Sequence, residues 1–71
     1  MKLPRDISGG EAVKAMKRLG FTVLRQEGSH IRMGRGATRL TIPNHSSIAP
    51  KTLQTLLRQA GVSLEEFVDA L

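Results

Sequence analysis

The chain has 71 residues, no cysteine, and a formal net charge of +5 at pH 7, from 11 Lys and Arg against 6 Asp and Glu. A chain this short is near the lower limit for an independent core, so we expect one domain over residues 1–71 and chemistry on an open face. The lack of cysteine excludes disulfides, thiolate zinc sites and a cysteine nucleophile. The basic charge favours an anionic partner.

The sequence also gives no support for a metal or cofactor site or for a membrane-spanning segment. The chain has 2 histidines, well separated, and few clustered carboxylates, so we expect no metal and no cofactor. No apolar run approaches the ~20 residues that a helix needs to cross a bilayer, and the N-terminus lacks the apolar segment of a signal peptide. We therefore expect no membrane partner and a cytoplasmic location.

The first predicted element is a helix between Ser8 and Gly20. Ser8 and Glu11 have the spacing of a capping box, and a glycine at position 20 suits the left-handed residue that ends a helix. Apolar residues follow helical spacing at Ala12, Val13, Ala15, Met16 and Leu19. The basic residues of the segment fall on the opposite face: Lys14, Lys17 and Arg18. Such a basic face is usually only solvated surface, but it can also contact the phosphates along a nucleic-acid backbone.

From position 21 to position 42 the apolar period changes to two, which predicts three strands separated by turns at 26–29 and 34–36. The residues expected on the core side are Phe21, Val23, Ile31, Met33, Leu40 and Ile42. Those expected on the other side include Thr22, His30, Arg32, Arg39 and Thr41. An antiparallel sheet with one covered face leaves the other face to water, so the second group should be exposed.

After a loop at 43–49, Pro50 suits the first turn of a second helix that ends at Gly61. Ser63 and Glu66 form another capping box and open a short last helix. The apolar residues expected to be buried by these two helices are Leu53, Leu56, Leu57, Ala60, Leu64, Phe67, Val68 and Leu71. The fold class is therefore α+β, in the order α-β-β-β-α, with a three-stranded antiparallel sheet, both main helices on one face, and a short extra C-terminal helix.

His30 is the candidate catalytic residue, because imidazole can take and give a proton near neutral pH. Period-two geometry places it on the same side as Arg32, and Arg39 shares that face; both guanidinium groups suit phosphate. RNA carries its own nucleophile, the 2′-OH, so such a face can cleave RNA without a metal, leaving a 2′,3′-cyclic phosphate and a 5′-hydroxyl. A lone histidine on a strand is, however, more often an ordinary surface residue.

The other candidate residues carry weaker signals. Gly28 can let a ribose–phosphate backbone approach and Ser29 can bind a phosphate, although a plain turn explains both equally well. His45 is a secondary acid–base candidate only if its loop folds back to the sheet, and Glu27 is weaker still. The candidate RNA contacts are Gly28, Ser29, Arg32, Arg39, Lys14 and Lys17. Both phenylalanines are at core positions, so we expect recognition through phosphates and shape, with loose sequence specificity.

Several short motifs occur together and span almost the whole chain. They are Lys17-Arg18-Leu19-Gly20-Phe21, Gly28-Ser29-His30, Thr41-Ile42-Pro43-Asn44-His45, Pro50-Lys51-Thr52-Leu53 and Leu57-Arg58-Gln59-Ala60-Gly61-Val62-Ser63, followed by Glu66-Phe67. As a set this pattern resembles the HicA (YcfA-like) mRNA interferase toxins of bacterial type II toxin–antitoxin systems. The resemblance implies a fold like the double-stranded-RNA-binding domain, translation-independent cleavage of mRNA, a catalytic role for His30, and neutralisation by a HicB-like antitoxin.

The residues by themselves leave two other functions open. A non-catalytic RNA-binding module would share the charge and the exposed face, but His30 would perform no chemistry. A protein–protein adaptor would use the basic face to dock an acidic partner, and its binding would not respond to salt as RNA binding does.

Overall fold

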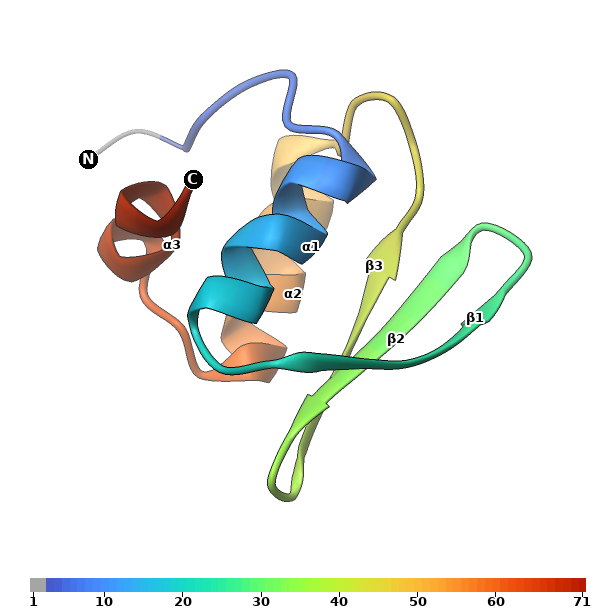
Figure 1. The fold of residues 1–71 in the computed structure, drawn as a ribbon. Helices are drawn as coiled ribbons and strands as arrows, with labels where there is room; N and C mark the ends of the chain where they lie inside the picture. Colours follow the sequence, from blue (N-terminus) through green and yellow to red (C-terminus); the bar gives the residue numbers. More distant parts are fainter. Residues whose placement is uncertain (1–2) are drawn as a thin grey trace.

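The computed structural model describes residues 3–71 of the chain. Its elements are α1 (Gly9–Arg18), β1 (Thr22–Glu27), β2 (His30–Arg35), β3 (Thr38–Pro43), α2 (Pro50–Ala60) and α3 (Leu64–Ala70) (Figure 1). The strands pair in chain order, and both pairs are antiparallel. The predicted α-β-β-β-α order with a short extra helix is confirmed. Within residues 3–71, no helix is long and apolar enough to cross a membrane.

The two predicted capping boxes are present. At the start of α1, the Ser8 N–H donates to Glu11 Oε1 and the Glu11 N–H donates to Ser8 Oγ, both at 3.1 Å. At the start of α3, the Ser63 N–H donates to Glu66 Oε1 at 3.1 Å and the Glu66 N–H donates to Ser63 Oγ at 3.0 Å. The backbone and side-chain hydrogen bonds from Ser63 favour the ionised carboxylate and so lower the pKa of Glu66.

Short turns at glycine join all consecutive elements except β3 and α2, which are connected by the loop at 44–49. Positive φ angles occur at Gly20 (96°), Gly28 (58°), Gly36 (58°) and Gly61 (68°). Gly28 and Gly36 each open a two-residue hairpin turn, where the absence of a Cβ removes the steric cost of this conformation. The second turn comes later than the predicted 34–36, because β2 continues through Arg35, which pairs with Thr38 of β3.

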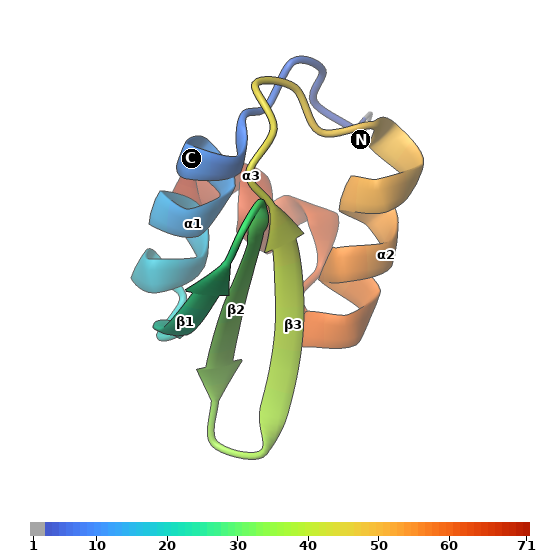
Figure 2. The same ribbon diagram turned by 90° about the vertical axis from the view of Figure 1, so that its right-hand side faces the viewer.

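The core lies between the sheet and the helices. Both α1 and α2 lie on one side of the sheet, and α3 packs against them (Figures 1 and 2). The largest fully buried side chains are Phe21, Phe67, Met16, Met33, Ile42, Leu53 and Leu56. Arg18 Nη1 also donates to the backbone oxygen of Ala70 at 2.7 Å, which joins α3 to α1. The short last helix is therefore part of the single core.

Two predicted core positions, Val23 and Leu71, are exposed, and the predicted Leu64 and Val68 are only partly buried. Val23 pairs with Met33 and so shares its side of the sheet, but it is 42% exposed. Both β1 and β3 are edge strands, but α2 packs against β3 whereas β1 has much less helix cover, so every residue of β1 is exposed. Leu71 is also exposed, because it follows the last turn of α3.

Candidate functional site

His30 is the first residue of β2, directly after the first hairpin turn. It pairs with Glu27 of β1 and with Pro43 of β3, and it precedes the buried Ile31. Because neighbouring residues of a strand point to opposite faces, its side chain lies on the face away from the core. The imidazole is exposed there. We call this side of the sheet the open face; it faces the viewer in Figure 2.

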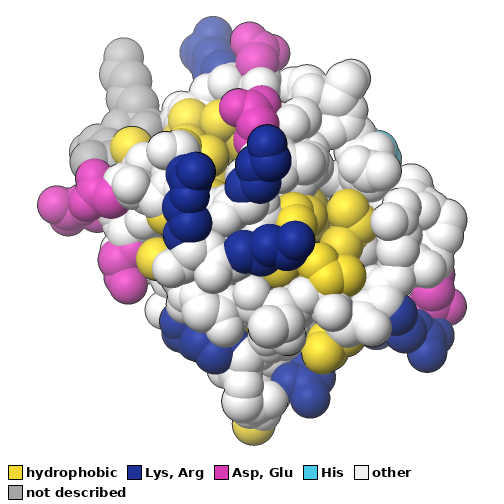
Figure 3. All heavy atoms as spheres, in the orientation of Figure 1, with side chains coloured by type: hydrophobic (Ala, Val, Ile, Leu, Met, Phe, Trp, Pro, Cys, Tyr) yellow, Lys and Arg dark blue, Asp and Glu magenta, His cyan; other side chains and the backbone are white. Residues whose placement is uncertain are grey.

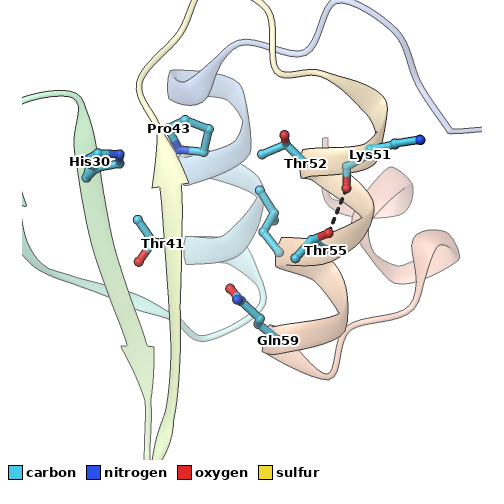
Figure 4. A pocket seen from close by; sticks show the side chains of 8 residues that line it. His30, Thr41, Pro43, Lys51, Thr52, Thr55 and Gln59 are labelled. Carbon is cyan, nitrogen blue, oxygen red and sulfur yellow. Dashed lines mark hydrogen bonds between the residues drawn. The ribbon is translucent and has the colours of Figure 1, made fainter.

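A cavity of about 390 Å³ lies between this end of the sheet and α2 (Figure 4). Its walls are His30, Thr41, Pro43, Lys51, Thr52, Thr55, Leu56 and Gln59. The α2 residues 52, 55, 56 and 59 recur every three or four positions, so they share one side of the helix. Sequence reasoning missed this wall, because nothing in the local pattern of α2 shows that it lies beside His30.

A second cavity, of about 520 Å³, continues along the open face. Its walls are Leu24, Arg25, Arg32, Met33, Arg39, Leu40, Thr41 and Gln59. Thr41 and Gln59 line both cavities, so the two cavities adjoin. We call the two together the open-face groove, with His30 and α2 at one end and the arginines at the other.

Two of the groove arginines share one carboxylate. Arg25 Nη2 lies 2.6 Å and Arg32 Nε 3.3 Å from Glu27 Oε1. All three side chains are at least half exposed, so water screens these pairs and each contributes only ~0–1 kcal/mol. A phosphate can therefore compete with Glu27 for the two guanidinium groups. The sequence pattern pointed to Arg32 but not to Arg25.

Arg39 reaches the open face next to a glycine of the neighbouring strand. A Cβ at Gly34 would lie 2.9 Å from both Arg39 Nη1 and Leu24 Cδ1, so the missing side chain leaves the space that these two groups fill. Arg39 Nη1 donates to the backbone oxygens of Gly36 at 2.6 Å and Thr38 at 3.0 Å. These bonds orient the guanidinium through one nitrogen, and its other nitrogens take no part in them.

Four predicted contacts lie outside the groove walls. Gly28 and Ser29 form the turn beside His30, where the Ser29 backbone oxygen accepts a hydrogen bond from the Asn44 N–H at 2.6 Å. Lys14 and Lys17 are exposed on α1. Figure 3 shows Lys and Arg side chains gathered over α1, beside a hydrophobic patch. The structure therefore brings Arg32 and Arg39 into one groove with His30, and leaves both lysines on another surface.

Neither predicted second acid–base residue lines the cavity with His30. His45 is exposed in the loop after β3, and its backbone oxygen accepts the Gly9 N–H at 2.8 Å, which ties the loop to the start of α1. Glu27 is the cross-strand neighbour of His30, but its carboxylate contacts Arg25 and Arg32.

The fold and the groove define a small basic α+β domain whose uncovered sheet face suits an extended anionic ligand. The family model described as the HicA toxin of bacterial toxin–antitoxin systems matches residues 9–62. Because that match covers most of the chain, the protein belongs to the HicA toxin family. The predicted family is confirmed, and with it a toxin role and an antitoxin as partner. No curated protein is similar enough to count as a match.

Proposed function

We propose that the protein is a metal-independent endoribonuclease toxin that cleaves mRNA, with His30 as its acid–base residue. One observation carries the proposal: in a chain of the HicA toxin family, an exposed histidine lines a groove that also holds three arginines. The histidine supplies proton transfer and the arginines supply the positive charge that a phosphodiester requires. Residues 1–71 act as a single domain of this family.

The reaction uses the nucleophile of the substrate. Neutral His30 takes the proton of a ribose 2′-OH, and the 2′-oxygen attacks the adjacent phosphorus. The bond between phosphorus and the 5′-oxygen then breaks, and the 5′-oxygen receives a proton. The products are a 2′,3′-cyclic phosphate and a 5′-hydroxyl. The imidazole accepts one proton from the 2′-OH, and the leaving 5′-oxygen needs one proton. A single histidine can therefore account for both proton transfers.

The groove arginines bind the phosphates next to the scissile bond. Guanidinium groups bind phosphate oxygens through two parallel hydrogen bonds, and they stabilise the additional charge of the five-coordinate transition state. Arg32 and Arg39 line the same groove as Thr41, which connects them to the cavity of His30. Lys14 and Lys17 on α1 add to the positive field that attracts RNA from a distance.

The partners follow from the same proposal. The RNA substrate is mRNA in the cytoplasm, and a HicB-like antitoxin neutralises the toxin. The second candidate function is a non-catalytic RNA-binding module. One observation favours it: the cavity walls include no second histidine and no carboxylate beside His30.

Comparison of wild type with His30→Ala separates the two functions. Purified proteins are incubated with labelled RNA in EDTA, and RNA affinity is measured in parallel. We expect His30→Ala to lose ~100-fold or more of the cleavage rate, as is typical for removal of an acid–base group, and to keep its affinity. His45→Ala is the matched control and should cleave like wild type. Equal cleavage by wild type and His30→Ala would overturn the role of His30, and binding without any cleavage would support the RNA-binding module.

A growth assay tests the same residue in cells. Expression of the wild-type chain without an antitoxin should arrest bacterial growth, and His30→Ala should relieve the arrest at equal protein level. Arrest by both proteins would contradict the proposal that cleavage at His30 causes toxicity.

A further inference from the structure

We infer that the end of the open-face groove next to α2 is a subsite for one unpaired nucleobase of the RNA, and that Gln59 determines which base is accepted. This inference rests on the proposed function, because it concerns the same groove. It departs from the sequence-based expectation of recognition through phosphates and shape alone.

The position of Gln59 is the first argument. Its side chain lines both cavities, and in Figure 4 it extends from α2 toward Thr41 across the groove. The residue is exposed, and none of the side-chain hydrogen bonds within residues 3–71 involves its amide. A carboxamide holds a donor and an acceptor side by side, which is the pattern that pairs with the edge of a nucleobase. Gln59 can therefore read a base that enters the groove.

The walls around Gln59 are the second argument. The half-buried Pro43 ring supplies apolar surface for the face of a base, and Thr52 and Thr55 supply hydroxyl groups, while Leu56 is buried beneath the cavity. The Thr55 hydroxyl donates to the backbone oxygen of Lys51 at 3.0 Å, so its orientation is set and its oxygen is left to accept a bond (Figure 4). Apolar surface beside a few oriented polar groups is typical of sites for small ligands.

The size of the cavity and its neighbours are the third argument. A volume of about 390 Å³ is near the lower end of ligand sites, which suits one base rather than a longer segment. His30 lines the same cavity, and the arginines lie beyond Thr41. When a base binds against α2, the phosphates of its nucleotide can therefore extend toward the arginine end of the groove. Bases in an A-form duplex are paired and stacked, and cannot enter such a cavity. The segment that is bound must be single-stranded.

The experiment compares base preference in wild type, Gln59→Ala and Gln54→Ala. Gln54 is the matched control, because it is exposed on the same helix but lines a different cavity, with Leu57 and Val62. A random RNA pool is cleaved, and the nucleotides around each new end are counted by sequencing. In parallel, affinity is measured for short 2′-fluoro oligonucleotides that differ at one base, which cannot be cleaved because they lack the 2′-OH.

We expect wild type and Gln54→Ala to prefer one base at one position near the cut. Gln59→Ala should reduce that preference by about 5- to 100-fold, the discrimination that a bidentate base contact provides. Gln59→Glu, whose carboxylate only accepts hydrogen bonds, should shift the preference toward bases with an amino group instead of removing it. Thermal unfolding of each variant checks that the fold is intact.

The outcomes separate this inference from the proposed function. If wild type cleaves and Gln59→Ala keeps the wild-type preference in both measurements, the inference is overturned and the nuclease proposal stands. An equal loss of preference in Gln54→Ala also overturns it, because the effect would then belong to the helix as a whole. If no protein cleaves but the oligonucleotide affinities still depend on Gln59, the subsite stands and the nuclease proposal fails.

Discussion

Gly9 and Gly10 stand side by side at the start of α1, and the structure predicts opposite effects when each becomes alanine. A Cβ at Gly9 would lie 2.6 Å from the backbone oxygen of Pro43 and 2.7 Å from Asn44 Cα, and neither backbone atom can rotate away. The Gly9 N–H also donates to the backbone oxygen of His45 at 2.8 Å. The nearest atom to a Cβ at Gly10 is Ser8 Oγ, at 3.9 Å.

The magnitudes follow from these contacts. Alanine in place of glycine stabilises the interior of a helix by ~0.5–1 kcal/mol and the first turn by less, and no contact opposes that smaller gain at Gly10. At Gly9 the added methyl overpacks a filled space, which costs ~1–3 kcal/mol. The added methyl group would also displace the loop after β3 and weaken the hydrogen bond from the Gly9 N–H to the His45 backbone oxygen, which lowers the free energy of unfolding by a further ~1 kcal/mol. We therefore expect Gly9→Ala to lower the free energy of unfolding by ~1–3 kcal/mol after the helix gain is subtracted.

Thermal and urea unfolding of the two variants test this prediction. For a domain of this size 1 kcal/mol corresponds to ~4–8 °C, so Gly9→Ala should unfold at least ~4 °C below wild type and Gly10→Ala slightly above it. Equal stabilisation by both alanines would refute the reasoning, because it would mean that α1 does not press on the end of β3. This contact also bears on the site, since Pro43 is a wall of the cavity that holds His30.

Two further predictions concern charge. Glu27→Gln removes the carboxylate that Arg25 and Arg32 share, so we expect RNA to bind ~3- to 10-fold more tightly and with a steeper salt dependence. Fluorescence anisotropy at two salt concentrations measures the affinity and its salt dependence. Weaker binding by Glu27→Gln would contradict the competition between Glu27 and phosphate. Glu66 has a lowered pKa because of its hydrogen bonds from Ser63, so its stabilising contribution is present above its ordinary pKa of 4.5 and is lost as pH falls through the lower folded value. Wild type should therefore lose more of its thermal stability than Glu66→Gln between pH 6 and pH 3, and equal losses in the two proteins would contradict this assignment.

Local chemistry explains why so much of the fold could be predicted. Capping boxes at Ser8 and Ser63 depend on residues three positions apart, and the alternation of His30 with Ile31 depends on neighbours in one strand. Such signals need no information about the rest of the molecule. They were sufficient for the boundaries of the helices, the order of the strands and the face on which His30 lies.

The errors and omissions involve contacts between distant segments. Val23 points to the expected side, but burial also requires a helix over it, and β1 has much less helix cover than β3. The pairing of β1 with β2 shifts in register after Val23, and beyond that shift Arg25 faces Arg32 across the strands. Arg25 therefore joins the groove through an irregularity of pairing that the period-two pattern does not contain.

The amino-acid sequence by itself determined the elements of this protein, its family resemblance and the candidate histidine, because each of these depends on residue types at short, regular spacing. The tertiary structure alone decided what surrounds that histidine. It set α2 beside β3, so that Gln59 and Thr55 stand across from His30, and it left Lys14 and Lys17 on a separate surface. The packing of helices against a twisted sheet determines which side chains meet, and that packing depends on the whole core rather than on any one segment.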